Sequence, residues 1–246
     1  MNLLEKEQRR PVPAAVFLII EAILYTLYLT LDLRFQHTLT LSDIFKYAGI
    51  VVCFFYTCYI SRKHPSAKGK AIYLVWCAFL VLFSDYCLLF THHYLPGILI
   101  FAAVQCLYFM YQAGPRRLPR FFIEALAIAF PAAIVLTLIW GLHSFLIYPA
   151  AFYMALLVIN VAHAFRQWHH NPCRQHLYFA VGLLLYGLCD LNVGFMNAPG
   201  FFSDVTPAAL HVLAAPAVQE MTTYAMWLFY LPAQVLIALS LNPDNN

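Results

Sequence analysis

Residues 71–90 read AIYLVWCAFLVLFSDYCLLF, an apolar run in which Asp85 is the only charged residue. About 20 apolar residues are enough for a helix to cross a bilayer, so the run predicts a membrane-spanning helix. A carboxylate inside such a helix costs on the order of 3 kcal/mol on insertion, which makes Asp85 a candidate functional residue. A second stretch, YGLCDLN at 186–192, places Asp190 in similar surroundings. The sequence therefore raises the question whether the two acids share one site.

The composition of the whole chain agrees with a membrane protein. Of its 246 residues, 63% are hydrophobic and 10% are charged, whereas a soluble domain carries about 25% charged residues. Eight apolar runs are long enough to span a bilayer, and because no strand alternation accompanies them we expect helices. The runs lie near residues 11–31, 43–61, 71–91, 95–113, 121–141, 144–165, 175–197 and 220–241. We therefore predict an all-α polytopic membrane protein with eight transmembrane helices in one integral membrane domain.

The Lys and Arg residues predict the orientation of these helices. If the eight runs cross in alternation, twelve of the 14 basic residues fall on one side of the membrane, and only Arg34 and Lys46 fall on the other. The positive-inside rule assigns the basic side to the cytoplasm, which places both termini there. A bacterial cytoplasmic membrane is expected, because no export signal or organelle address is visible. The net charge of +3 gives no indication of nucleic-acid binding.

The two halves of the chain show a similar order of features. The third and seventh runs carry Asp85 and Asp190 at comparable depth, and the runs that follow them carry Gln105 and Gln234. An even number of helices in each half gives a 4+4 parallel repeat, in which both halves insert in the same direction. The match is short, but it suggests an internal duplication.

Two buried carboxyl groups have a defined chemical use. Burial disfavours the charged form of each group, and two close carboxylates do not ionise together easily. Such a pair can hold one proton near neutral pH, leaving one general acid and one base or anion. The alternative is structural, with Asp85 and Asp190 each hydrogen-bonding a neighbouring helix separately. Their matched depth favours the shared site.

Other polar side chains in the runs could complete a cavity around the acids. Lys46 is predicted at about the depth of Asp85, where it could pair with one carboxylate; a lysine that reaches up to the interface is the alternative. Five more candidates lie within the spans, and two pairs among them are three or four residues apart and so share a helix face. Each could instead hold helices together. They are Gln105, Tyr108, Tyr153, Tyr230 and Gln234.

Some polar residues fit such a site less well. Asn192 is two residues from Asp190 and therefore points elsewhere on its helix. Glu21, in the first run, could join the cavity or pair with another helix. One loop contains a cluster of potential metal ligands without a second ligand pair at a recurring distance, so we expect no metal site there. The cluster is His169, His170, Cys173 and His176.

The segment 198–219 is predicted to be the longest on the outer side. Ser203 and Asp204 could cap a short helix that begins near Ala208 and ends before Pro216. The segment could act as a lid over an outer cavity or as a plain connector on the membrane surface. The seven cysteines are expected to be packing residues rather than a disulfide framework.

The order of these motifs resembles that of the YhhN-type membrane proteins, the lysoplasmalogenases, over most of the chain. The resemblance covers eight helices with both termini inside and a series of short motifs. These are Phe45-Lys46-Tyr47, Ser84-Asp85, Gln105 to Tyr108, Pro149 with Tyr153, Gly182 to Asp190, and Tyr230 to Gln234. Three positions depart from the family pattern: Tyr47 stands for a common Pro, Gln105 for a frequent His, and Cys189 for Ser.

The resemblance implies hydrolysis of the vinyl ether bond of a lysoplasmalogen, a lysophospholipid, to a fatty aldehyde and a glycerophospho-alcohol. It places Asp85 and Asp190 as the acid–base pair, with Lys46 biasing their protonation. Ser84 and the five polar candidates would position water and the glycerol oxygens. No metal or cofactor is required, because protonation on carbon and attack by water complete the reaction. The partners expected are thus a single-chain lipid substrate and the bilayer itself.

Two other classes of function remain open at this stage. Buried carboxylates with a nearby lysine also occur in proton-coupled transporters, and a two-half repeat suits a transporter. Against this, only Pro131, Pro149 and Pro232 could interrupt a helix. The third class is a non-catalytic lipid-binding or assembly protein in which both acids are structural.

Overall fold

Eight long helices make up the fold of the computed structural model, which describes residues 12–35, 40–63, 68–87, 90 and 94–242. Each helix is long and apolar enough to cross a membrane, and the described residues contain no strand. The predicted all-α, eight-span architecture is therefore confirmed. The helices are α2 (Val12–Phe35), α3 (Thr40–Lys63), α4 (Lys68–Tyr86), α5 (Tyr94–Ala113), α6 (Leu118–Ile134), α7 (Ile147–His170), α8 (Arg174–Asn197) and α9 (Pro216–Leu239).

The largest differences from the predicted spans concern α4 and α6. Helix α4 ends at Tyr86, whereas the apolar run was predicted to continue to residue 91. Helix α6 gives way to a π-helical turn at Val135–Ile139, where the amide of Trp140 donates to the carbonyl of Val135 at 3.0 Å. Pro131 lies one turn earlier and cannot donate a backbone hydrogen bond, which weakens the regular ladder at this point.

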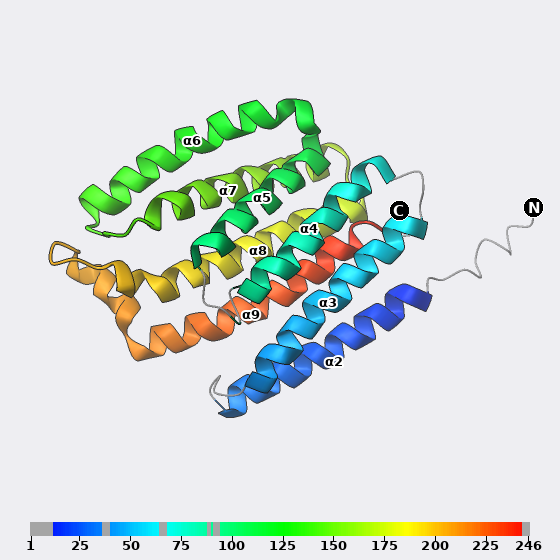
Figure 1. The fold of residues 1–246 in the computed structure, drawn as a ribbon, viewed down its shortest axis with the longest axis horizontal. Helices are drawn as coiled ribbons and strands as arrows, with labels where there is room; N and C mark the ends of the chain where they lie inside the picture. The colour runs from blue at the N-terminus through cyan, green and yellow to red at the C-terminus, as the bar shows by residue number, and fades with distance from the viewer. Residues whose placement is uncertain (1–11, 36–39, 64–67, 88–89, 91–93, 243–246) are drawn as a thin grey trace, which may run out of the picture.

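Six of the helices pack in a closed ring. The order of neighbours is α3, α4, α5, α7, α8, α9 and back to α3. Helix α2 packs outside this ring on α3 and α9, and α6 packs outside it on α7 and α5. Figure 1 shows α2 and α6 at opposite edges of the bundle. The ring directs one face of each of six helices toward a common interior.

The packing follows the 4+4 repeat suggested by the sequence. Exchanging α2–α5 for α6–α9 converts every helix pair named above into another pair that is also in contact. For example, α5 packs on α7 in one half, and α9 packs on α3 in the other. The fourth helix of each half thus lies against the second helix of the other half, as expected for two halves related by an axis along the membrane normal.

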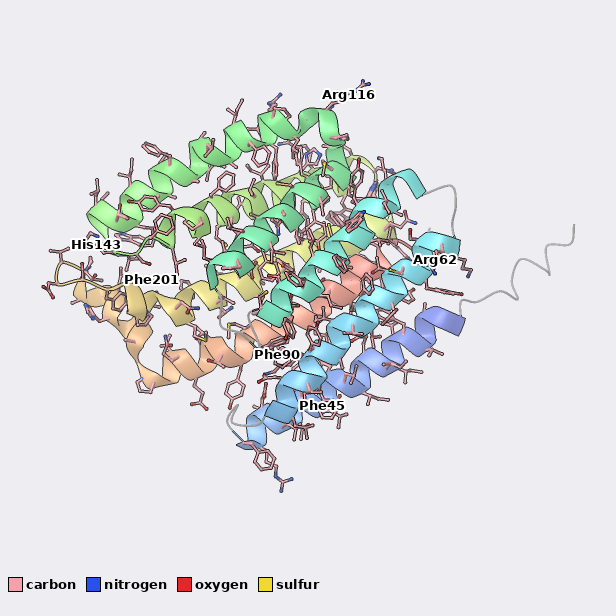
Figure 2. All side chains as sticks on the ribbon, viewed as in Figure 1. Phe45, Arg62, Phe90, Arg116, His143 and Phe201 are labelled. Atoms are coloured by element: carbon pink, nitrogen blue, oxygen red, sulfur yellow. The ribbon has the colours of Figure 1, made fainter. Side chains whose placement is uncertain are left out.

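The ends of the bundle differ in charge. Figure 2 shows Arg62 and Arg116 at one end and Phe45, His143 and Phe201 at the other. We call the first the basic end. The first residue of α2 and the last residue of α9 also lie at the basic end (Figure 1). The helices therefore alternate in direction as the distribution of Lys and Arg predicted.

The segment between α8 and α9 is tied to the turn between α6 and α7. The hydroxyls of Ser203 and Thr206 both donate to the carbonyl of Gly141, at 2.5 and 3.0 Å. Gly141 has a φ of 64°, and a Cβ there would lie 2.8 Å from Val205, so glycine is required. The predicted short helix is a 3₁₀ segment, Ala208–Ala214. Ser203 and Asp204 do not cap it: the capping position is Pro207, and the Ser203 hydroxyl is used by the α6–α7 turn.

Candidate functional site

Asp85 lies in the last turn of α4 and is buried, with 4% of its surface exposed. Asp85 lies on the face of α4 that points into the ring, together with the buried apolar residues of this helix. The hydroxyl of Tyr230, from α9, lies 2.8 Å from one carboxylate oxygen and 2.7 Å from the other. Because α4 and α9 come from different halves, the contact joins the two halves of the ring. Burial of a carboxylate is costly unless it is hydrogen-bonded, and the Tyr230 hydroxyl supplies this hydrogen bond.

Asp190 has a matching arrangement on α8. Its carboxylate accepts a hydrogen bond from the hydroxyl of Tyr153 on α7. Asp190 is half-buried, unlike Asp85. The two sequence-predicted acids and two of the predicted tyrosines thus form two acid–tyrosine pairs.

Aromatic rings connect the two pairs. The ring of Tyr186 lies 5.6 Å from that of Tyr230 and 5.9 Å from that of Phe101. Phe101 in turn lies 6.2 Å from Tyr153. The hydroxyl of Tyr186 is buried and has no hydrogen-bond partner in the structure. The two pairs therefore lie on either side of one aromatic cluster, with a free hydroxyl between them.

Gln105 is held in place by a residue that sequence reasoning missed. Asn160, on α7, is fully buried and donates to the side-chain oxygen of Gln105 at 2.9 Å and to its backbone oxygen at 2.8 Å. Gln112 donates to Asn160 at 3.1 Å. The signal was present, because Asn160 is seven residues from Tyr153 and so lies on the same helix face.

Gln234 of α9 and Tyr108 of α5 lie together in the interior of the ring. Both line a space of about 10 Å³ with Cys53 and Thr57 of α3. This is about the volume that one water requires. The amide nitrogen of Gln234 is buried without a partner, so a water there would have a donor to bind. These candidates surround a polar pocket of water size.

Lys46 requires a correction. It was considered as a partner of one of the two acids, with a lysine at the interface as the alternative, but its salt bridges go to Asp32 at 3.0 Å and to Asp43 at 3.2 Å. Asp32 also accepts a hydrogen bond from Ser42. Asp32 lies on α2 just beyond the predicted end of the first run, so the buried partner closest to Lys46 was overlooked. The carboxylate that neutralises Lys46 is therefore supplied by the helix outside the ring.

Lys46 nevertheless adjoins the site through an aromatic ring. Its ammonium group lies 5.0 Å from the centre of the Trp227 ring. Trp227 packs edge-on against Tyr230 at 5.5 Å. Lys46 thus supports the tyrosine that binds Asp85 without touching the acid.

The remaining polar residues have structural partners. Ser84 donates to the carbonyl of Gly97 on α5 at 3.1 Å, so its hydroxyl joins two helices. Glu21 accepts from the Cys53 thiol at 3.3 Å, which is the pairing with another helix considered above. Asn192 donates to the carbonyl of Leu188 in its own helix at 2.7 Å and does not point to Asp190. All seven cysteines are free.

The histidine-rich turn after α7 has ordinary contacts. His169 and His170 have rings 5.9 Å apart, and a ring nitrogen of His176 lies 3.0 Å from the carbonyl of Asn171. Within the described ranges, no three His, Cys, Asp or Glu side chains are grouped as metal ligands would be.

The arrangement is that of a chemical site inside a bilayer. Two carboxyl groups, each held by a tyrosine, can donate and accept a proton in a desolvated interior. The fold and the site thus define a class: an eight-span membrane protein with a buried pair of acid–tyrosine contacts.

The chain belongs to the YhhN family, whose family model matches residues 41–241. The match covers α3 to α9 and leaves out α2, which carries Asp32. Searches of curated proteins and of solved structures found no match.

Proposed function

We propose that this YhhN-family membrane protein is a lysoplasmalogenase, a hydrolase that cleaves the vinyl ether bond of lysoplasmalogens. The observation that carries the proposal is the pair of carboxyls, Asp85 with Tyr230 and Asp190 with Tyr153, in one ring of helices. Membership of the YhhN family supports the same reaction class.

The reaction needs one acid and one base. A carboxylic acid donates its proton to the double-bond carbon that does not bear the ether oxygen. This leaves an oxocarbenium ion beside the resulting carboxylate. Water adds to the carbon that bears the oxygen, and a carboxylate accepts the proton that the water releases. The hemiacetal then breaks its carbon–oxygen bond to give a fatty aldehyde and a glycerophospho-alcohol such as glycerophosphoethanolamine. The sum consumes one water and regenerates both carboxyl states.

Paired carboxyls suit this intermediate. Glycosidases use two carboxyls for a similar oxocarbenium ion. In this chain the half-buried Asp190 has one oxygen outside its hydrogen bond with Tyr153, whereas both oxygens of Asp85 face the Tyr230 hydroxyl. We therefore assign proton donation to Asp190 and stabilisation of the cation to Asp85. Gln105, Tyr108, Tyr186 and Gln234 would bind water and the glycerol oxygens.

The position of the acids along their helices orients the substrate. Asp85 lies 15 residues after Lys70, and Asp190 lies 14 residues after His176. At the rise of an α-helix, each acid is therefore about 21–22 Å along its helix from the basic end. The lipid headgroup would therefore lie toward the opposite end, with the chain reaching between helices into the bilayer. With the basic end in the cytoplasm, the headgroup faces outward.

The test is aldehyde release by the purified protein in mixed micelles with a lysoplasmalogen. Asp85→Asn and Asp190→Asn should each lower turnover by a factor on the order of 10²–10⁴, the usual contribution of a general acid or base. Asp204→Asn is the matched control, because Asp204 is exposed and lies in the α8–α9 connector. Wild-type turnover in both site variants would exclude the pair as catalytic.

The exchange of helix contacts between the halves favours one second candidate, a proton-coupled carrier. Against it, α4, α5, α7 and α8 run without a break, and α9 continues through Pro232. Flux assays in proteoliposomes separate the two functions. Proton-coupled uptake of a lysolipid without aldehyde release would favour the carrier.

A further inference from the structure

A basic vestibule opens at the basic end of the bundle, well away from the two acids. It has a volume of about 510 Å³. Three permanent cations and three histidines line it, contributed by α4, the turn before α6, α7 and α8. They are Lys70, Arg117, Arg166, His163, His170 and His176. None of its described lining residues carries a carboxylate.

A groove with a mixed polar and apolar lining continues from the vestibule along the outside of the bundle. It lies between α6 and α7 and has a volume of about 600 Å³. Arg117, His163 and Arg166 line both hollows, which makes them continuous. The groove wall includes Ile128 and Val158, which are 45% and 54% exposed and belong to membrane-spanning helices. Figure 1 shows α6 at the edge of the bundle.

The vestibule has an unused hydrogen-bond acceptor. Gln112 lines it and is 6% exposed. Its amide nitrogen donates to Asn160, but its side-chain oxygen is buried without a partner. A headgroup hydroxyl would satisfy that oxygen. An ammonium headgroup would do so less well, because the surrounding charge is positive.

We propose that the basic vestibule and the α6–α7 groove together bind an anionic phospholipid with a hydroxylated headgroup. Its phosphate lies among Lys70, Arg117 and Arg166, and an acyl chain lies in the groove beside Ile128 and Val158. Arginine suits this role because its planar guanidinium binds phosphate oxygens in pairs. Glu124 at the groove does not oppose the phosphate, because it is paired with Arg120 at 2.8 Å.

The lipid at this site cannot be the substrate in its reacting position. In a lysophospholipid five single bonds separate the phosphorus from the ether oxygen, which is about 7.5 Å at full extension. The vestibule residues Lys70 and His176 are about 21–22 Å of helix from Asp85 and Asp190. The vestibule is therefore a second lipid site, and its occupancy does not depend on whether the acids are catalytic.

Binding of phosphatidylglycerol to the detergent-purified full chain tests the proposal, with native mass spectrometry as the readout. Arg117→Gln combined with Arg166→Gln should raise the Kd about 30-fold, since each cation near a lipid surface contributes about a fivefold factor. Arg116→Gln is the matched control, because Arg116 is adjacent but lines neither hollow. It should change the Kd less than twofold. Phosphatidylcholine should bind weakly to all variants.

A second pair of variants tests the groove. Ala162→Phe fills it, whereas Ala127→Phe adds the same ring to an exposed face of α6 outside it. Only Ala162→Phe should weaken phosphatidylglycerol binding, by about tenfold. Inorganic phosphate serves as the third probe: if it competes as well as the lipid does, the site takes a free anion and the lipid proposal is overturned.

Other outcomes of the binding experiment also test the proposed lipid site. An equal loss in Arg116→Gln means general surface charge and overturns the site, as does unchanged binding in the double variant. If the double variant does not fold, the single Arg117→Gln replaces it, with an expected rise in Kd of about fivefold. Aldehyde release is measured separately, so a failure of the proposed hydrolase leaves this result intact.

Discussion

At the scale of single residues, the two acids are held in similar but unequal ways. Tyr230 faces both oxygens of Asp85, and that carboxylate is almost fully buried. Tyr153 binds one oxygen of Asp190, which is only half-buried. Removing the tyrosine from Asp85 leaves an almost fully buried carboxylate without its donor, whereas Asp190 is less enclosed. The two tyrosines should therefore differ in importance.

Tyr230→Phe should lower aldehyde release about 10–100-fold, the effect of one lost hydrogen bond to a charged group. Tyr153→Phe should have a smaller effect. Tyr25→Phe is the control, because Tyr25 donates to a backbone carbonyl of α9 away from the acids. The measurement is kcat for each purified variant. A larger loss in Tyr153→Phe than in Tyr230→Phe would contradict the ranking.

Lys46 gives a second prediction at this scale, because its main partner is Asp32. Lys46→Met should destabilise the protein by about 3–5 kcal/mol, since it leaves the buried carboxylate of Asp32 without its cation. Lys46→Met with Asp32→Leu should recover much of that loss. Thermal unfolding in detergent measures both. If the charge of Lys46 has no direct role at the two acids, the recovered double variant should also keep most of its turnover.

The sequence predicted which residues form the site better than it predicted which of them bind each other. Asp85, Asp190, Tyr153 and Tyr230 are visible because a polar group in a lipid-spanning run is costly and so stands out. Which tyrosine binds which acid depends on the order of helices around the ring, and no local pattern encodes that order. Lys46 was assigned the wrong partner for the same reason, because nothing in the sequence places α2 beside α3 and α9.

At the scale of elements, α8 and α9 approach each other closely at Gly182. A Cβ on Gly182 would lie 2.8 Å from Ile237 and 3.1 Å from the backbone oxygen of Ala233. Small residues at such contacts let two membrane helices approach. Since α8 carries Asp190 and α9 carries Tyr230, this contact sets the spacing of the site.

Gly182→Ala should therefore destabilise the protein by about 1–3 kcal/mol through overpacking. Gly194→Ala, in the same helix, is the matched control, because nothing lies within 4 Å of a Cβ there. It should be neutral or should stabilise by about 0.5–1 kcal/mol, because alanine is the better helix former. Thermal unfolding in detergent compares the two. Equal losses would mean that the α8–α9 contact tolerates a methyl group.

Element boundaries were predictable where charge or proline marks them and less so elsewhere. The eight runs were found because apolar length alone defines a span. The π-helical turn after α6 and the 3₁₀ segment after α8 depend on backbone hydrogen bonds with no sequence period of their own. The Ser203 and Asp204 cap was wrong because the Ser203 hydroxyl has a stronger use in binding Gly141.

At the scale of the whole molecule, the two-half ring directs both acids toward one interior. Helices α4 and α8 occupy equivalent positions in the two halves, so residues at the same depth face the same interior. Asp190 receives its tyrosine from α7, the second helix of its own half, whereas Asp85 receives its tyrosine from α9, the fourth helix of the other half. The two halves differ in the residues that bind the acids. In the second half Tyr230 lies four residues before Gln234, whereas in the first half the residue four before Gln105 is Phe101. The two halves thus carry acids with unequal partners, which fits the reaction proposed above.

The orientation of the molecule gives the last prediction. Most of the basic residues lie at one end, together with the first residue of α2 and the last of α9. The positive-inside rule therefore predicts that this end faces the cytoplasm. In a background without the partly exposed native cysteines, Arg116→Cys should be protected from a membrane-impermeant maleimide in intact cells, whereas His143→Cys should react. Both should react after the membrane is permeabilised, which controls for accessibility. Labelling of Arg116→Cys alone in intact cells would invert the topology and place the substrate headgroup on the cytoplasmic side.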